Sequence, residues 1–251
     1  MSAQAYYERI RGVLEEIHRT QAEKLTQAGE GIAAAIAAGR TVWVFGSGHS
    51  VIPVQDIFPR YGSFVGFYPL YDPRLMWFNV IGPGGAPELL WLERQEGYAE
   101  VFLKSYPLQA GDVMLVFSHG GMNAAPIEVA LEAKKQGLTV ITVSSHANRR
   151  LIAPTHSSGK ALSDVADIAI DNCVPPEDAL VDIGKREPVA AGSTIAAVFI
   201  AMALVAETGT RLADRGFDLT TFVSPNVPGV AGDHNQKVFE AFTRFVYARH
   251  P

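Results

Sequence analysis

Residues 41–50 read TVWVFGSGHS, and this stretch decides the fold. Its first half, VWVF, is an apolar run without alternation, which is typical of a strand buried on both faces of a parallel sheet. Its second half, GSGHS, combines glycines that let a ligand approach the backbone with serine hydroxyls that donate hydrogen bonds. A helix that begins near Ser50 would add free N–H groups. The pattern predicts either a bound phosphate or a tight turn that binds nothing.

The composition limits the number of domains and the kinds of partner that this protein can have. The chain has 251 residues, 48% of them hydrophobic and 19% charged, which is enough for one large α/β domain or two small ones. Its net charge is −5 and no basic run stands out, so nucleic acid is not an expected partner. A single cysteine, Cys173, favours a reducing compartment. The charged N-terminus predicts no signal peptide, and the apolar run 195–206 is too short to span a bilayer. We expect a cytoplasmic protein with no membrane partner.

Strand patterns alternate with helix patterns along the chain. Apolar residues at helical spacing between residues 10 and 36 predict one long helix or two, with a possible break at Gly29 and Gly31. This helix must pack on the sheet or on another subunit. The alternation predicts a doubly wound parallel sheet. We expect one domain, with an N-terminal helical segment (1–40), a core (41–216) and a C-terminal helical tail (217–251). Strands are expected at 42–45, 64–70, 112–117, 138–143 and 165–170, and further helices at 51–61, 88–106, 126–136, 193–215 and 235–247.

Three of the expected strands end in loops that carry serine. Ser47 and Ser50 follow the first strand, Ser118 follows the third, and Ser144 and Ser145 follow the fourth. Ligands of such sheets bind outside the carboxyl ends of the strands, so these loops should converge on one crevice. The sequence therefore predicts a site for an anionic ligand.

These loops carry a resemblance to a known family. VFGSGHS, VFSHGGMN and TVSSH resemble the three phosphate-binding segments of the sugar isomerase (SIS) domain, over roughly residues 41–207. LERQEGYAEV, NAAPIEVALEAKKQGL, HSSGK, ADIAIDNC and GDHN are similar to segments of stand-alone SIS proteins identified as phosphosugar isomerases. The resemblance implies a three-layer αβα sandwich with a five-stranded parallel sheet in flavodoxin-like order. It also implies a phosphorylated sugar as ligand and a homo-oligomer, dimer or tetramer, with sites near subunit interfaces.

The second segment departs from the family pattern. Gly120 stands where the pattern has its second serine, and Asn123 stands where a hydroxyl is common. Backbone N–H groups, His119 and Asn123 could substitute for the lost hydroxyls. The phosphosugar-binding residues that we predict are Gly46, Ser47, Gly48, Ser50, Ser118, His119, Gly121, Asn123, Ser144, Ser145 and Ser193.

Sugar phosphate isomerisation needs a base beside the carbon, an acid for the oxygens and a fixed phosphate. Glu93 and Glu96 are three residues apart, so within a helix over 88–106 they would share one face. A solvated helix face is the alternative interpretation. Glu96 matches the second active-site glutamate of N-acetylmuramic acid 6-phosphate etherase, and we predict that it is the general base, with Glu93 orienting it or contacting sugar hydroxyls. Trp77 and Phe78, in the Gly-rich loop 71–87, would shield it and raise its pKa.

Two histidines complete the predicted catalytic set. His49 lies inside the first glycine loop, and His234 lies in GDHN at a helix start. Histidine titrates near neutral pH and suits proton transfer. In the family that the chain resembles, such C-terminal tails often complete a neighbour's site.

Competing motifs are incomplete. No H-x-x-x-H or H-E-x-x-H spacing occurs, so we expect no metal. Gly46-x-Gly48 lacks the third glycine of a dinucleotide fingerprint, because Val51 stands there, and we expect no cofactor. Residues 157–160, SSGK, fit S-x-x-K, but the S-D-N and K-T-G segments that accompany it are absent. We expect instead a polar loop that contacts ligand or the next subunit.

The sequence is best explained as a phosphosugar-binding protein that interconverts an aldose and a ketose phosphate by proton transfer through an enediol(ate). A sugar phosphate lyase or etherase is the first alternative. The second is a phosphosugar sensor without turnover. A transcriptional sensor would carry a DNA-binding helix-turn-helix, for which the first 40 residues are too short and too acidic.

Overall fold

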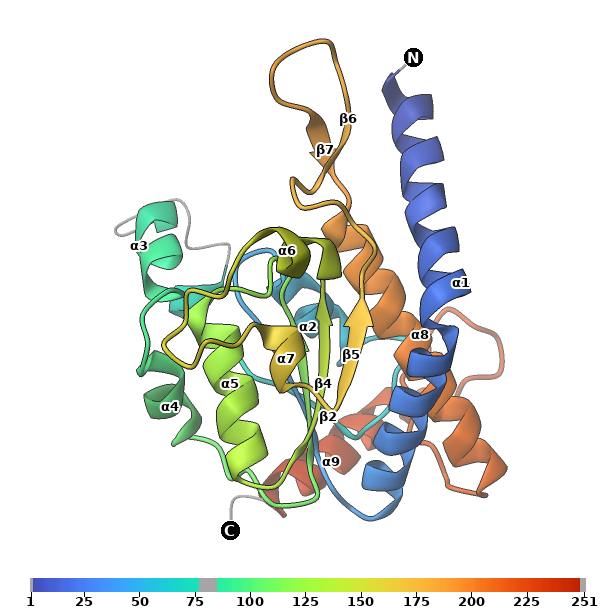
Figure 1. Ribbon diagram of the computed structural model, residues 1–251. Coiled ribbons are helices and arrows are strands. Elements are labelled where there is room, and N and C mark those ends of the chain that lie inside the picture. The colour runs from blue at the N-terminus through green and yellow to red at the C-terminus, as the bar shows by residue number, and fades with distance from the viewer. Residues whose placement is uncertain (1, 77–84, 249–251) are drawn as a thin grey trace.

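The computed structural model describes residues 2–76 and 85–248, and its centre is a five-stranded, all-parallel sheet (Figure 1). The strand order is β2-β1-β3-β4-β5, so Val42 of β1 pairs with Phe67 on one side and Val113 on the other. This order is flavodoxin-like and confirms the predicted fold class. The strands are β1 (Val42–Gly46), β2 (Phe67–Pro69), β3 (Val113–Phe117), β4 (Thr139–Ser144) and β5 (Ile168–Asp171).

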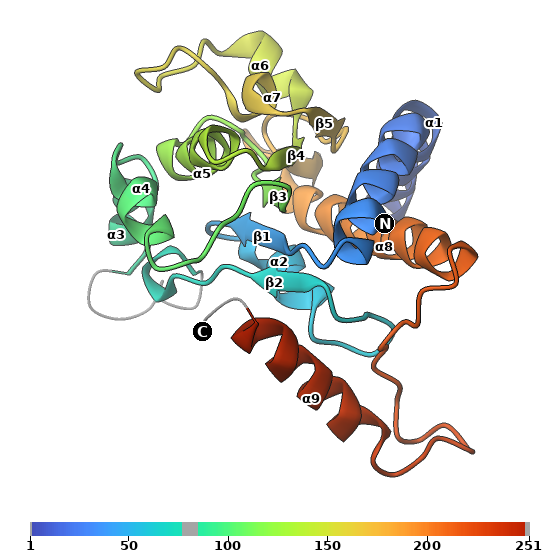
Figure 2. The ribbon, with the colours of Figure 1, turned by 90° about the horizontal axis from the view of Figure 1, so that it is seen from below.

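Helices cover both faces of the sheet and make three layers. One face packs against α1, α2 and α8, and the other packs against α4, α5 and α7 (Figure 2). A two-stranded antiparallel hairpin, β6 (Ala179–Val181) with β7 (Val189–Ala191), leads into α8. The helices are α1 (Ser2–Ala37), α2 (Val51–Ile57), the 3₁₀ turn η1 (Pro73–Leu75), α3 (Gly85–Leu92), α4 (Tyr98–Leu103), α5 (Ala124–Lys135), α6 (His146–Leu151), α7 (Leu162–Val165), α8 (Ser193–Asp214) and α9 (His234–Tyr247).

The apolar run of β1 is buried on both sides, as predicted. Val42 and Val44 join the core beneath α1 and α8, whereas Trp43 and Phe45 join the core beneath α4 and α5. The indole N–H of Trp43 donates to the buried carboxylate of Asp112 at 3.0 Å. That bond satisfies a polar atom that burial would otherwise leave unpaired.

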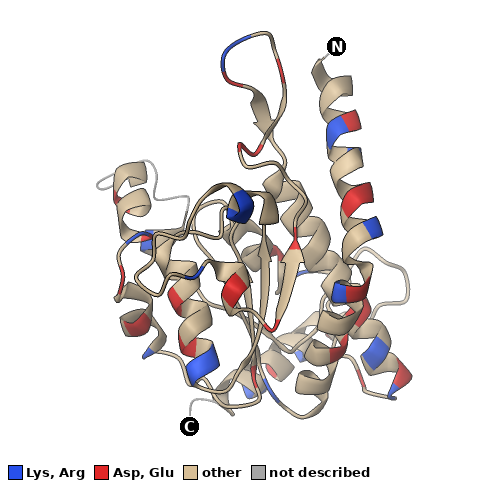
Figure 3. Cartoon of the chain, in the orientation of Figure 1, with Lys and Arg blue, Asp and Glu red and all other residues tan. Residues whose placement is uncertain are grey.

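Helix α1 is one unbroken helix whose apolar stripe is buried within its own chain against α8 and β5. Gly29 is a contact point and not a break, because a Cβ at this position would lie 2.6 Å from the Cβ of Glu207 in α8. Acidic and basic residues are interspersed along α1 (Figure 3), and Arg19 lies 2.6 Å from Glu16. Of the two predicted alternatives, packing on the sheet or on another subunit, the stripe adopts packing within its own chain.

Helix α8 is, among the described helices, long and apolar enough to cross a membrane by length and composition, with a mean hydropathy of 1.6. A core helix of a soluble protein passes the same test. Here α8 packs lengthwise against α1 and also contacts α2, with Ala196, Ile200 and Leu204 buried. The apolar run 195–206 does form a helix, but the helix is only partly buried, because Ile195 is 40% exposed.

The predicted helix over 88–106 is wrong. The chain forms α3 and α4 instead, separated at residues 93–97. Gly97 has a φ of +86°, a left-handed conformation that glycine adopts without strain, and it redirects the chain into α4. Glu93 and Glu96 therefore do not share a helix face. The predicted lid residues Trp77 and Phe78 lie outside the described residues.

Candidate functional site

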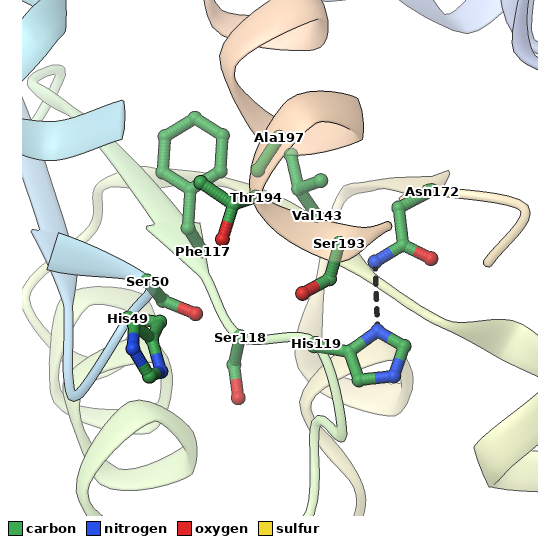
Figure 4. Close-up of a pocket in the computed structure, with 10 residues that line it drawn as sticks. All are labelled: His49, Ser50, Phe117, Ser118, His119, Val143, Asn172, Ser193, Thr194 and Ala197. Atoms are coloured by element: carbon green, nitrogen blue, oxygen red, sulfur yellow. Dashed lines mark hydrogen bonds between the residues drawn. The ribbon is translucent and has the colours of Figure 1, made fainter. Parts of the chain in front are cut away.

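A crevice opens at the carboxyl ends of the strands, where the sequence predicts an anion site (Figure 4). We call it the strand-end crevice. Its enclosed part is only about 10 Å³, room for roughly one water molecule, so a larger ligand must lie across its mouth or displace side chains. It is lined by His49, Ser50, Phe117, Ser118, His119, Val143, Asn172, Ser193, Thr194 and Ala197.

The loop after β1 forms one wall of the crevice, and its glycines are sterically required. A Cβ at Gly46 would lie 2.2 Å from the backbone oxygen of Ser50, so this position admits no side chain. Gly48 has a φ of +59° and its N–H donates to Leu75 at 2.8 Å. These constraints turn the chain sharply, and Figure 4 shows the Ser50 hydroxyl directed into the crevice.

The loop after β3 brings Ser118 and His119 to the opposite wall. Gly121 turns this loop with a φ of +66°, and its N–H donates to the Ser118 hydroxyl oxygen at 3.3 Å. A Cβ at Gly121 would lie 3.2 Å from the Cβ of Ser144, so the β3 and β4 loops approach closely there. The Ser118 hydroxyl accepts the Gly121 N–H and retains its own proton for a ligand.

His119 is held in one tautomer by Asn172 at the end of β5. The Asn172 oxygen accepts the N–H of Val174 at 3.0 Å, so its amide nitrogen faces His119 Nδ1 at 3.1 Å (Figure 4). Because Nδ1 accepts that bond, the proton of the neutral ring is assigned to Nε2. This Nε2 is buried and has no hydrogen-bond partner among the described residues. His119 therefore offers an N–H donor at the crevice.

Glu93 is a buried carboxylate, 6% exposed, that does not itself line the crevice but contacts the loop after β1, which forms one of its walls. The Ser47 hydroxyl donates to it at 3.0 Å, and the Asn123 side chain also hydrogen-bonds it. Burial raises the pKa of Glu93, while Ser47, Arg94 and Asn123 oppose that rise. The site thus holds a carboxyl group that is easier to protonate than an exposed one.

Glu96 lies in a different environment from the one predicted. Its carboxylate accepts the hydroxyl and, at 2.7 Å, the N–H of Ser157, and these bonds lower its pKa. The predicted upward shift is therefore wrong, because Ser157 stabilises the ionised form and 39% of the side chain is exposed. Glu96 does not line the strand-end crevice. It lines a second pocket with Arg94 and Asn123.

Two predicted serines have their hydroxyl protons engaged elsewhere. Ser145 donates to the Val174 carbonyl at 2.7 Å and is 1% exposed. Ser193 lines the crevice, but its hydroxyl donates to Asp178 at 2.8 Å, and its N–H donates to the same carboxylate at 2.7 Å. The Asp178 charge thereby satisfies the N-terminus of α8, which would otherwise attract an anion.

The two predicted catalytic histidines lie far apart within the chain. His49 lines the crevice. His234 begins α9, and its Nε2 is 2.8 Å from the Thr221 carbonyl. Thr221 bridges to Phe64, which precedes the amino end of β2, whereas the crevice lies at the carboxyl ends of the strands. Within one chain, His234 does not join the other predicted residues.

Several residues of the site were not predicted. Asn172 and Thr194 line the crevice, and Asp178 caps α8. Asn172 directly follows β5, so the rule that selected the serine loops would also have selected it. No local signal marks Asp178, which reaches α8 across the β6–β7 hairpin. Among residues 2–76 and 85–248, no group of three or more His, Cys, Asp or Glu side chains is placed to hold a metal ion.

Solved structures show where this fold occurs. The chain is similar to a phosphoheptose isomerase from Neisseria gonorrhoeae, with a TM-score of 0.56 and 17% identity over 83% of this chain and 97% of that one. A phosphoheptose isomerase from Francisella tularensis gives a TM-score of 0.55 and 16% identity, over 83% of this chain and 96% of that one. At these identities the likeness establishes the fold alone.

Sequence relatives cover almost the whole chain. A UPF0309 protein of Oceanobacillus iheyensis is 33% identical over 238 residues, 94% of this chain and 95% of the relative. A UPF0309 protein of Shouchella clausii is 35% identical over 239 residues, 94% of each. The family model described as the SIS domain matches residues 5–145, more than half of the chain. The chain belongs to the SIS domain family and is a homologue of the UPF0309 proteins.

Proposed function

We propose that this protein binds a phosphorylated sugar across the strand-end crevice and interconverts its aldose and ketose forms. The observation that carries the proposal is Glu93. It is a buried carboxylate with a raised pKa, held between Ser47 of the first predicted phosphate loop and Asn123 of the second. A base poised toward neutral pH at this edge of the sheet is what proton abstraction beside a carbonyl requires.

The phosphate lies at the mouth of the crevice, between the β1 and β3 loops. Ser50 and Ser118 both line the crevice (Figure 4), and among residues 2–76 and 85–248 neither hydroxyl donates a hydrogen bond. The α8 side is disfavoured, because Asp178 adds a negative charge beside Ser193. The phosphate is therefore assigned to Ser50 and Ser118, and the sugar extends toward Glu93.

The proposed reaction moves one proton between two carbons and one proton between two oxygens, and it needs no external oxidant or reductant. Glu93 removes the proton from the carbon beside the carbonyl, and His119 donates through Nε2 to the carbonyl oxygen, which gives an enediol(ate). Glu93 returns its proton to the former carbonyl carbon, while the hydroxyl on the neighbouring carbon gives its proton back to His119 Nε2 and becomes the new carbonyl. A fixed phosphate keeps the reacting carbons beside Glu93 throughout.

Glu93 replaces Glu96 as the proposed base. Neither glutamate lines the crevice itself, but Glu93 bonds Ser47 of the loop that forms its wall, whereas Glu96 bonds Ser157, is 39% exposed and has a lowered pKa. A base with a pKa far below the working pH abstracts protons poorly. Glu93 is buried, and its pKa moves toward the working range.

The protein is further proposed to work as a homo-oligomer. Large apolar side chains are exposed on segments around the carboxyl end of the sheet, including Leu151 at 71% and Ile183 at 48%. A neighbouring subunit would remove them from water, and could place its His234 beside this chain's crevice. Static light scattering of the protein and of a Leu151→Asp, Ile183→Asp variant tests this. An unchanged mass in the variant would exclude this surface as the contact.

The test of function is turnover against a panel of aldose and ketose phosphates, followed by NMR. Interconversion of an aldose and a ketose, with solvent deuterium entering at the reacting carbon, supports the isomerase. Loss of an ether substituent supports the lyase or etherase, and saturable binding without turnover supports the sensor. Absence of binding to every sugar phosphate in the panel refutes the proposal.

A further inference from the structure

A second pocket lies on the far side of the 118–123 loop from the strand-end crevice. We call it the His156 pocket. Its volume is about 230 Å³, so it is far roomier than the enclosed crevice. The two share one loop, because Ser118 and His119 line the crevice while Met122 and Asn123 line the pocket. The lining residues are Arg94, Glu96, Met122, Asn123, Ala124, Thr155 and His156.

His156 carries a buried donor with no hydrogen-bond partner. Its side chain is 6% exposed, and its Nδ1 accepts the N–H of Ser158 at 3.1 Å. A backbone N–H can only donate, so the proton of the neutral ring is assigned to Nε2. That Nε2 has no hydrogen-bond partner among the described residues. Burying an N–H without an acceptor is costly, so a ligand or water is expected to meet it.

Two carboxylates stand near this N–H at distances too long for hydrogen bonds. Nε2 is 3.9 Å from Glu96 and 3.7 Å from Glu128. Both carboxylates are held by other donors, Glu96 by Ser157 and Glu128 by the N–H of Gly97 at 2.5 Å. Neither is free to swing toward the ring. An oxygen atom placed about 2.8 Å from Nε2 and about 2.8 Å from a carboxylate oxygen would make two hydrogen bonds of normal length and so bridge the two groups.

The group at that point must accept one hydrogen bond and donate another. It accepts the N–H of His156 and donates to Glu96 or Glu128, and a hydroxyl does both. A phosphate or carboxylate oxygen only accepts, and it would lie against two negative charges with Arg94 as the single full positive charge in the lining. The mixed donors and acceptors therefore favour a neutral, hydroxyl-rich group over a second anion.

We propose that the His156 pocket binds the hydroxyl groups of the sugar at the end remote from the phosphate. This inference rests on the proposed phosphosugar function and narrows its substrate class. The substrate carries free hydroxyls at that end and no acidic substituent. Asn123 joins the two pockets, because it lines this one and hydrogen-bonds Glu93 beside the other.

The test uses a matched pair of variants. His156→Phe keeps an aromatic ring and removes the N–H, whereas His156→Gln places an amide N–H near the position of Nε2. The control is His18→Phe, at an exposed histidine of α1. Isothermal titration calorimetry measures each protein against inorganic phosphate and against the sugar phosphate that the parent binds best. Thermal melting checks that every variant is folded.

We expect His156→Phe to weaken binding of the sugar phosphate by about 3- to 10-fold, the usual effect of one lost hydrogen bond. Binding of inorganic phosphate should not change, and His156→Gln should recover most of the loss. Equal affinity of His156→Phe and the parent for the sugar phosphate would overturn the inference and leave the proposed function standing. An equal loss for inorganic phosphate would also overturn it. A parent that binds inorganic phosphate but no sugar phosphate would overturn both.

Discussion

Substituting Glu93 by glutamine separates the proposed base from a merely structural carboxylate. Glu93→Gln keeps the size of the side chain and one acceptor oxygen for Ser47, but cannot take a proton. A positioned base contributes about 10²–10⁴-fold to rate, which corresponds to roughly 3–5 kcal/mol of activation free energy. We expect kcat to fall by that factor, while KM for the sugar phosphate changes little because Ser50 and Ser118 hold the phosphate.

The direction of the pKa shift adds a second readout. Burial raises the pKa of Glu93 above its ordinary 4.5, so the folded protein holds this proton more tightly than the unfolded chain. The contribution of protonated Glu93 to the free energy of unfolding is fully present below about pH 4.5. It is lost as the pH rises through the pKa of Glu93 in the folded protein. The glutamine of Glu93→Gln cannot ionise. The melting temperature of the variant minus that of the parent should therefore increase from pH 4 to pH 7. The rate of the parent should rise over the same interval, as the base ionises.

The matched control is Glu96→Gln, three residues away and on the exposed side of the α3–α4 turn. Because Glu96 is proposed to accept a sugar hydroxyl and not a proton from carbon, this variant should affect KM more than kcat. A Glu93→Gln variant with full turnover would refute the assignment of the base. If the Glu96 variant lost turnover by 10²-fold or more instead, the base would belong in the His156 pocket.

Three further outcomes test the crevice. Ser50→Ala and Ser118→Ala should each weaken binding of the sugar phosphate by about 1–3 kcal/mol, measured by calorimetry, through loss of a hydrogen bond to a charged group; unchanged affinity in both would remove the phosphate from this crevice. Gly46→Ala should abolish binding, since its Cβ would lie 2.2 Å from the Ser50 oxygen, and a variant with parental affinity and melting temperature would contradict that geometry. Asn172→Asp should lower kcat by about 10²-fold or more with little change in KM, because a carboxylate beside Nδ1 would draw the His119 proton from Nε2; unchanged kcat would show that this tautomer is not needed.

The parallel sheet could be predicted because its evidence is local. Strands β1 and β3 are continuous apolar runs, and the core on both faces explains why: Val42 and Trp43 point to opposite layers, and both are fully buried. The end of such a strand also marks the edge where a site forms. That rule predicts Ser50 and Ser118, the family resemblance adds His119 as a substitute for a lost hydroxyl, and the structure brings the three together.

The parts that could not be predicted depend on contacts distant in sequence. Glu93 and Glu96 are three residues apart, yet one is buried against Ser47 and the other bonds Ser157. Gly97 is a local signal for a helix end, but it does not by itself exclude one helix over 88–106. His156 shows no periodicity, and its unpaired N–H exists only because Ser158 occupies the other nitrogen.

The different surroundings of Glu93 and Glu96 explain why two carboxylates in one short turn suit different roles, one in proton transfer and the other in hydroxyl binding. Each carboxylate has donors, but only Glu93 is removed from water, and desolvation is the largest influence on its pKa. Its donors, Ser47 and Asn123, come from the two loops that the phosphate would also engage. Glu96, ionised and fixed by Ser157, can accept hydrogen bonds without competing for the proton. The burial that makes Glu93 costly to ionise is therefore the feature that suits it to exchange a proton with a carbon acid, and the exposure of Glu96 suits it to hold a hydroxyl.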